Sequence, residues 1–398
     1  YETYILVDFA ACSTEIRDLF NDVSDLNRIF MRLQLEYGTE LKERKSAIIF
    51  DEVQLAPKAR QAIKYLVKDG RYDYIETGSL ISIRKNVKNI LIPSEEVKLH
   101  MYPMDYEEFK WALGDTATIK LLQNCFNGRT SLGDATNRKL MRDFRLYMLV
   151  GGMPQAVSAY LETNNLEKVD SVKRSIITLY EDDFNKIDQS GNISKMFRQI
   201  PAQLTSNANR YLTWRATDGT RNSNLAELIS EMKESMVVNM AYHANDPSAG
   251  MALHQAPDKY KMFVGDTGLF VTLAFWDKKF TDNTIYHKLL SDKLNADLGY
   301  VYENVIAQML KAAGHELYYY TFPTDSGKHN YEVDFLIADE DKVSPVEVKS
   351  SGYKAHASLD AFCGKFSARI KNKYLIYTKD MRKEADMLYM PVYMTMFL

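Results

Sequence analysis

The sequence predicts a mixed α/β protein with a parallel sheet at its N-terminal end. Three observations predict this class. Short apolar runs alternate with helical patterns up to about residue 79, helical spacing dominates from about residue 137 to 186, and strand patterns return beyond residue 316. Alternating strands and helices are typical of parallel sheets with both faces covered. We therefore expect a helical middle part and a second, smaller α/β part at the C-terminal end.

Three apolar runs define the N-terminal sheet. They cover residues 3–9, 46–52 and 71–79, and residues 58–69 carry helical spacing. Each of the last two runs ends in polar residues. Because ligands of parallel sheets bind beyond the carboxyl ends of the strands, those polar residues are the first candidates for a functional site.

Two carboxylates, Asp51 and Glu52, end the second run, and the hydroxyls of Thr77 and Ser79 end the third. In P-loop ATPases the first acid of such a pair holds Mg²⁺, usually through water, and the second polarises the attacking water. Hydroxyls on the next strand could orient the same water. A strand that ends in two acids is also common in α/β proteins without this chemistry, so the pair alone leaves both interpretations open.

The middle of the chain is predicted to be helical. Residues 137–186 have a helical pattern that Gly151-Gly152-Met153-Pro154 interrupts. Residues 192–245 suggest two or three short helices followed by an extended run over residues 235–242. Short helices followed by a strand suit a winged-helix-like module.

The C-terminal part has an α/β pattern of its own. Helices are predicted over residues 298–313 and 356–366. Strands are predicted over residues 316–322, 331–338, 343–349 and 373–378.

Four charged residues of this part have the arrangement of a nuclease site. Glu303 lies on the first predicted helix, Asp334 on one strand, and Glu347 and Lys349 on one face of the next. In PD-(D/E)xK nucleases such carboxylates, here Asp334 and Glu347, hold Mg²⁺ against a phosphodiester, and the lysine positions the nucleophilic water. A buried structural ion-pair network has the same composition, so the fold and the cleavage are separate questions.

Composition excludes several classes of protein. The three cysteines are far apart, which excludes a disulfide framework and a thiol zinc site, and the seven histidines include no HExxH motif. No run reaches the length of a membrane-spanning helix, so we expect a cytoplasmic protein with no membrane partner. The net charge of −3 gives no support for bulk coating of nucleic acid, although the stretch from Lys342 to Lys373 is locally basic.

Several segments together resemble a prokaryotic family of AAA-type P-loop ATPases whose C-terminal half is a domain of unknown function. They follow the family order and extend over nearly the whole chain. The similar segments are Ile48–Gln54, Thr77–Ser79, Leu99–Phe109, Gly151–Pro154, Tyr260–Phe263, Asp266–Leu269 and Gly299–Asn304. With this resemblance we expect an AAA-type ATPase domain at residues 1–135, a helical and winged-helix-like domain at 136–275, and a PD-(D/E)xK nuclease-like domain at 276–398.

The resemblance also implies roles for individual residues, with ATP and Mg²⁺ as cofactors. It implies that Asp51 is the Mg²⁺-associated acid and that Glu52 is the catalytic acid. Ser79, or else Thr77, would be the sensor residue, and Arg84 would sense phosphate.

One part of the family pattern is absent from the sequence. The family has a glycine-rich loop ending in Gly-Lys-Thr or Gly-Lys-Ser before the strand that corresponds to residues 3–9, and no G-x-x-x-x-G-K-[ST] occurs in the 398 residues. Without those amides and that lysine nothing cradles the β- and γ-phosphates. Since the first residue is Tyr1 rather than Met, we expect the loop upstream of it, and we expect the 398 residues alone to bind ATP poorly.

Three functions follow as hypotheses. The first is an ATP-dependent switch whose C-terminal half recognises DNA or a protein partner. The second is a Mg²⁺-dependent nuclease controlled by the ATPase domain. The third is a non-catalytic nucleic-acid-binding module in which nucleotide only sets the conformation. The identity of the partner and the oligomeric state stay open.

Overall fold

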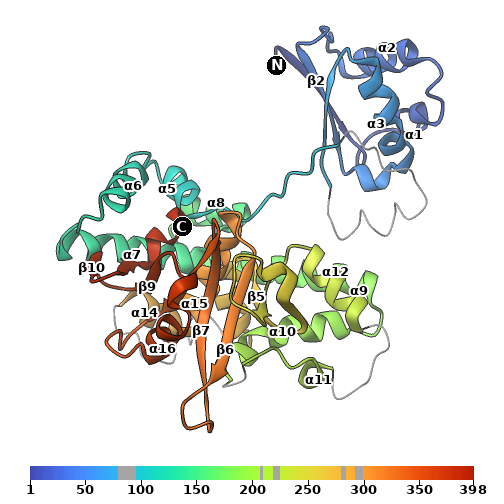
Figure 1. Cartoon of the computed structure of the whole chain (residues 1–398). Helices are drawn as coiled ribbons and strands as arrows, with labels where there is room; N and C mark the ends of the chain where they lie inside the picture. The colour runs from blue at the N-terminus through green and yellow to red at the C-terminus, as the bar shows by residue number, and fades with distance from the viewer. Residues whose placement is uncertain (79–95, 207–208, 218–224, 279–283, 292–298) are drawn as a thin grey trace. The chain divides into compact units, whose positions relative to one another are not determined.

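The chain divides into two compact units, Tyr1–Met101 and Tyr102–Leu398 (Figure 1). The computed structural model describes residues 1–78, 96–206, 209–217, 225–278, 284–291 and 299–398. It confirms the predicted mixed α/β class with a parallel sheet. Within the described residues, no helix has both the length and the apolar character needed to cross a membrane.

The first unit is a three-stranded parallel sheet, in the order β1-β2-β3, with helices between the strands. Its elements agree with the apolar runs to within a few residues. They are β1 (Thr3–Asp8), α1 (Thr14–Asp18), α2 (Leu26–Tyr37), β2 (Ser46–Asp51), α3 (Pro57–Asp69) and β3 (Asp73–Glu76).

One face of this sheet carries the core of the unit. Ile5, Val7, Ile48 and Phe50 are buried in one hydrophobic cluster with residues of α1, α2 and α3. The other face presents a row across the three strands, in which Leu6 pairs with Ile49 and Ile49 with Ile75. Leu6 and Ile75 are each 44% exposed. Among the described residues of this unit, the helices therefore cover one face only.

The second unit contains the remaining helices around an eight-stranded mixed sheet (Figure 1). The strand order is β10-β11-β9-β8-β7-β6-β4-β5. The strands are β4 (Val238–Ala244), β5 (Gln255–Val264), β6 (Leu317–Pro323), β7 (Asn330–Asp339), β8 (Lys342–Val348), β9 (Lys373–Tyr377), β10 (Arg382–Glu384) and β11 (Met387–Pro391).

Counted over the residues that the structure describes, the helices of the second unit fall into two groups along the chain. Eight precede the sheet: α5 (Tyr106–Ala112), α6 (Thr118–Gly128), α7 (Asp134–Val150), α8 (Pro154–Thr163), α9 (Leu166–Ile187), α10 (Asn192–Thr205), α11 (Thr213–Ala216) and α12 (Leu225–Glu234). Four lie between strands: α13 (Thr267–Ala274), α14 (Thr284–Leu290), α15 (Gly299–Ala312) and α16 (Ala357–Lys365). Helix α15 packs against β4, β5, β6 and β8.

The extended run predicted near residue 240 is strand β4, which pairs with β5 on one side and with β6 on the other. It is therefore part of the large sheet. The predicted domain boundaries after residues 135 and 275 both fall inside the second unit. The winged-helix-like module and the three-domain division stay predictions.

Two of the glycine motifs interlock at the point where the chain enters the second unit. The Met104 amide donates to the Gly152 carbonyl (2.8 Å), and the Gly152 amide donates to the Asp266 carboxylate (2.6 Å). The other oxygen of Asp266 caps α13 by accepting from the Leu269 amide (2.8 Å). A Cβ on Gly152 would lie 2.1 Å from the Met104 carbonyl oxygen, so only glycine fits where the backbones of Met104 and Gly152 meet.

The last residues of the chain close the second unit. The Asp380 carboxylate accepts hydrogen bonds from the amides of Leu132 (3.1 Å) and Gly133 (2.6 Å). The Tyr393 hydroxyl, buried, donates to the Asn137 side chain (2.8 Å). The start of α7 is thus held by residues almost 250 positions later.

Candidate functional site

The carboxyl end of β2 brings together two of the predicted ATPase residues. The Thr77 hydroxyl, just after β3, donates to the Asp51 carboxylate. The same oxygen of Asp51 accepts from the Glu52 amide (3.1 Å). Backbone bonds from the Thr77 amide to the Phe50 carbonyl (2.9 Å) and from the Val53 amide to the Thr77 carbonyl (3.1 Å) fix this geometry.

Glu52 leaves the strand in a left-handed conformation, with φ of 53°. A non-glycine residue in this region is uncommon and marks a sharp turn. The Gln54 side-chain amide donates to the Glu52 carboxylate at 2.5 Å. The turn therefore directs the second acid away from the strand and holds it through a neutral partner, so its negative charge is not offset by that contact.

Asp8 is a neighbour of this site that lies outside the sequence motifs. It ends β1 and pairs in register with Asp51. Its carboxylate accepts from the Ala10 amide (2.7 Å). The signal was present in the sequence, since Asp8 ends the first apolar run as Asp51 ends the second.

Two other predicted residues, Ser79 and Arg84, lie outside the described residues. Their predicted roles as sensor and phosphate-sensing arginine stay predictions. The oxygen atoms of Asp51 and Thr77 are of the kind that Mg²⁺ prefers, so the described residues fit a magnesium ion held through water.

A second charged site lies on the large sheet. Lys349 Nζ lies 2.7 Å from Glu347 Oε1, and the Val348 amide donates to the Asp334 carboxylate (2.8 Å). The second of these interactions ties β7 to β8, and the first lies at the end of β8. The four residues predicted for a nuclease-like site, Glu303, Asp334, Glu347 and Lys349, lie near one another, since the charges of Glu303 and Glu347 act on Asp334 and those of Asp334 and Glu303 act on Lys349.

Burial dominates the electrostatics of these carboxylates. It raises the pKa of Asp334 well above its usual range, and the charges of Glu347 and Glu303 raise it further. Burial also raises the pKa of Glu303 and Glu347, while Lys261 opposes the shift of Glu303 and Lys349 opposes that of Glu347. Glu347 is 4% exposed, and its Oε2 has no hydrogen-bond partner.

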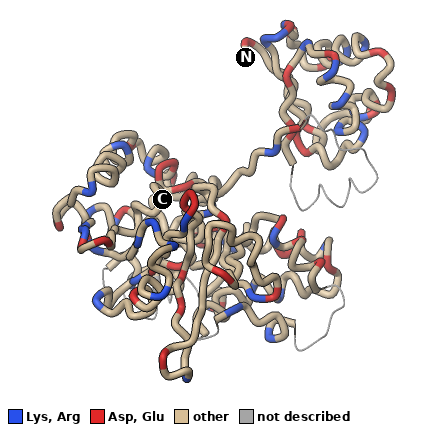
Figure 2. The backbone as a smooth tube through the Cα atoms, in the orientation of Figure 1, with Lys and Arg blue, Asp and Glu red and all other residues tan. Residues whose placement is uncertain are grey.

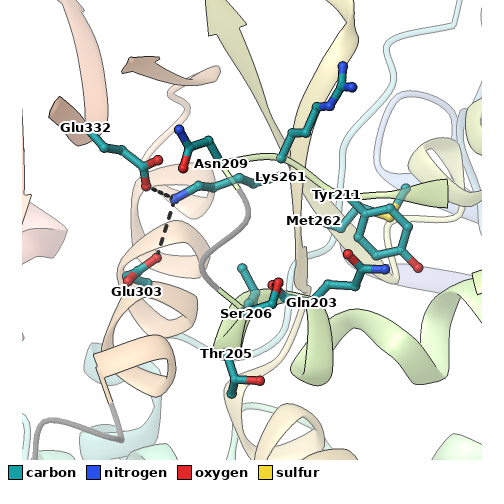
Figure 3. A pocket seen from close by; sticks show the side chains of 11 residues that line it. Gln203, Thr205, Ser206, Asn209, Tyr211, Lys261, Met262, Glu303 and Glu332 are labelled. Atoms are coloured by element: carbon teal, nitrogen blue, oxygen red, sulfur yellow. Dashed lines mark hydrogen bonds and ion pairs between the residues drawn. The ribbon is translucent and has the colours of Figure 1, made fainter. Parts of the chain in front are cut away.

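Sequence reasoning missed the lysine at the centre of this cluster. Lys261 Nζ, on β5, contacts the Glu332 carboxylate and lies 3.8 Å from Glu303 Oε2 (Figure 3). In the sequence, Tyr260–Phe263 is similar to a family motif, which does not mark the lysine. The sign that could have pointed to Lys261 is its position as the single charged residue of the apolar run 260–264.

A cavity of about 360 Å³ borders the cluster. Lys261, Glu303 and Glu332 line it on one side, and Arg210 and Tyr211 line it too (Figure 3). A second cavity shares Asn209 and Arg210 with the first and adds Lys259, His243 and Thr321. Arg210 and Lys259 form no ion pair with any residue that the structure describes.

The basic stretch after Lys342 is largely offset by acids in the fold. Lys371 pairs with Asp339 (3.1 Å) and Glu340 (2.7 Å), and Lys373 pairs with Asp386. Acidic and basic residues are interspersed along both units (Figure 2). This stretch is therefore no continuous basic surface.

The comparison with protein families supports a nucleotide-binding module of the AAA type in the first unit. Residues 2–110 match the family described as an AAA domain, which supports an AAA-type P-loop ATPase. Residues 141–279 match a domain of unknown function (DUF8612), and residues 298–395 match another (DUF4143). The last match is consistent with the C-terminal domain of the family that the sequence resembles.

Comparison with curated proteins gave no match. Among solved structures, the crystal structure of protein VC1899 from Vibrio cholerae aligns with 99% of this chain and 95% of its own. The two are 9% identical, with a TM-score of 0.19. A similarity this low carries no argument about fold or function.

Proposed function

We propose that the protein is an AAA-type ATPase that acts as a nucleotide-dependent switch, with DNA or a protein partner recognised by its C-terminal half. The observation that supports this most directly is the contact between Asp51 and Thr77 at the carboxyl end of the parallel sheet. It lies within the residues that match an AAA domain. The site holds Asp51 and the separately oriented Glu52 at the end of β2, and the Thr77 hydroxyl at the end of the neighbouring strand β3.

Each group has a distinct role in the proposal. Asp51 would hold a Mg²⁺ ion through water, and the Thr77 hydroxyl fixes the position of the Asp51 carboxylate. Glu52, turned away by its left-handed backbone, polarises the attacking water. Mg²⁺ bound there would neutralise the phosphate charge. Ser79 and Arg84 keep the sensor roles that the resemblance implies.

The proposal needs a phosphate cradle that the 398 residues do not encode, since they contain no glycine-rich G-x-x-x-x-G-K-[ST] loop. Residues from outside this sequence would supply it. The direct test measures ATP hydrolysis by the full-length protein as it is encoded, compared with its Glu52→Gln variant.

We expect Glu52→Gln to lower the hydrolysis rate by about 100-fold or more, because it removes the general base but keeps the shape of the side chain. Glu43→Gln, at an exposed position of the same unit, is the matched control and should hydrolyse ATP at the wild-type rate. Equal hydrolysis by wild type and Glu52→Gln would refute the assignment of ATP hydrolysis to this site. Tight ATP binding without turnover in the wild type would select the non-catalytic switch.

A second candidate is a nuclease or a nucleic-acid-binding module in the second unit. Two observations favour it: the clustering of Asp334, Glu347 and Lys349, and the position at the adjoining cavities of Arg210 and Lys259, which form no ion pair with another described residue. Cleavage of plasmid or single-stranded DNA with Mg²⁺, lost in Glu347→Gln, would support the nuclease. Salt-dependent DNA binding without cleavage, weakened in Arg210→Gln, would support the binding module.

A further inference from the structure

We propose that the ammonium group of Lys261 is a built-in counter-ion of Glu303 and Glu332 in the carboxylate cluster, and that its fixed positive charge keeps a divalent metal out of the nuclease-like site, against the metal-dependent nuclease considered above. The cluster is then assembled without metal. This inference concerns only the second unit and does not depend on the ATPase proposal.

Lys261 reaches the carboxylates from a strand outside the predicted motif. It lies on β5 opposite Ala241 of β4, and it is 7% exposed. Its Nζ contacts Glu332 on β7 and lies 3.8 Å from Glu303 Oε2 on α15 (Figure 3). One ammonium group thus joins acids from a helix and a strand, which is the bridging that a metal ion provides.

The other acids are also held by groups of the protein. Asp334 accepts from the Val348 amide, and Glu347 Oε1 pairs with Lys349. Among the described residues, no three His, Cys, Asp or Glu side chains lie in an arrangement that could hold a metal ion. Glu347 Oε2 is buried and has no hydrogen-bond partner among the described residues. Because Lys261 and Lys349 already lie beside Glu303, Glu332 and Glu347, this arrangement does not fit the Mg²⁺ that the nuclease-like motif implies.

The electrostatics favour a charged lysine at this position. Burial lowers the pKa of Lys261, but the charges of Glu303, Glu332 and Asp334 outweigh it, so that the pKa lies above its usual value. The Nζ also lies 5.4 Å from the centre of the Tyr319 ring, a further favourable contact for a cation. A metal ion bound by Glu303 would meet this fixed positive charge, so the lysine and the metal exclude each other.

The test is the binding of Mn²⁺ to the nucleotide-free full chain, followed by the electron paramagnetic resonance signal of the free ion. All proteins carry Asp51→Asn, which removes the candidate magnesium ligand of the first unit. We expect no site at the cluster in this background. Lys261→Met should gain about one Mn²⁺ per chain, since it frees both carboxylates while keeping the length of the side chain.

Two variants assign the gained ion to the cluster. Adding Glu303→Gln to Lys261→Met should abolish it. Lys259→Met, two residues along the same strand and without an ion pair among the described residues, should gain none.

Two results would overturn the inference. One is a Mn²⁺ site in the Lys261-containing protein that Glu303→Gln or Glu347→Gln removes. This result needs no folded lysine variant, so it tests the inference even if Lys261→Met fails to fold. The second is a folded Lys261→Met protein that gains no Mn²⁺.

Discussion

Both units gather acids on their sheets, but they neutralise them differently. In the first unit, the partners of Asp51 and Glu52 are a hydroxyl, an amide nitrogen and a glutamine side chain. No described lysine or arginine forms an ion pair with either acid. In the second unit Lys261 and Lys349 offset three of the carboxylates directly.

The acids of the first unit are therefore able to bind a cation from solution, whereas those of the second unit already have a lysine ammonium group as their cation. Hydroxyl and amide partners orient a carboxylate without cancelling its charge, which leaves it able to attract Mg²⁺. An ammonium group cancels the charge and occupies the space. Four substitutions can break or sharpen this comparison, from the largest expected effect to the smallest.

Gly152→Ala should unfold the second unit selectively. The new Cβ would lie 2.1 Å from the Met104 carbonyl oxygen and 2.7 Å from its nitrogen, both backbone atoms that cannot yield. We expect a loss of more than about 3 kcal/mol in the free energy of unfolding of that unit. Urea unfolding followed by circular dichroism should show its transition displaced, while that of residues 1–101 is unchanged.

Gly364→Ala is the matched control, because α16 leaves nothing within 4 Å of its Cβ. Alanine there should be neutral or stabilising by up to about 1 kcal/mol. A Gly152→Ala protein that unfolds at the wild-type urea concentration would contradict the close contact between Gly152 and Met104.

Lys261→Met should destabilise the second unit by about 3 kcal/mol, because it leaves the partly buried carboxylates of Glu303 and Glu332 without their shared cation. Removing Glu332 as well, by Glu332→Gln, should recover part of that loss. The measurement is the urea midpoint at neutral pH. Lys259→Met should change it by less than about 0.5 kcal/mol, and an equal loss in both lysine variants would contradict the built-in cation.

The first unit should lose stability as pH rises from about 4.5 to about 7. Burial raises the pKa of Glu76 to about 7, although Arg60, 3.4 Å away, acts against the shift and Glu96 acts with it. The folded state then binds more protons than the unfolded state in this window, so raising the pH favours unfolding, by roughly 3 kcal/mol in all. Thermal unfolding across this range should show the loss, and Glu76→Gln should remove it.

Thr77→Val should have the smallest effect on stability and a larger one on nucleotide chemistry. It removes one partly exposed hydrogen bond to Asp51, worth about 1 kcal/mol. ATP hydrolysis by the full-length protein should fall by more than that bond implies, because Asp51 loses its orientation. Thr39→Val, whose hydroxyl donates to the Tyr37 carbonyl (3.2 Å), is the control. Equal hydrolysis by both variants would place Thr77 outside the site.

The sequence was most informative where structure is local. The runs at residues 3–9 and 46–52 became β1 and β2, and residues 58–69 became α3, because apolar spacing decides which face of an element is buried. The acids at the end of β2 were visible for the same reason. Their catalytic roles stay predictions.

The order of the large sheet could not be read from the sequence. Strand β4 pairs with β6, which begins more than 70 residues later, and such pairing leaves no local pattern. Lys261 was missed for a related reason. The role of Lys261 depends on its contacts with Glu303 and Glu332. These residues come close to Lys261 only when the sheet is assembled in that order.

The contacts of Asp380 and Tyr393 with the start of α7 bear on how the protein is made. The residues of the first unit up to Met101 are translated before the second unit begins, but α7 cannot make these contacts until Asp380 and Tyr393 have emerged from the ribosome. At roughly 5–20 residues per second, translation of the intervening 300 residues takes about 15–60 s. During that interval the ribosome carries a folded first unit and an open, apolar remainder, which makes the second unit the part that depends on chaperones.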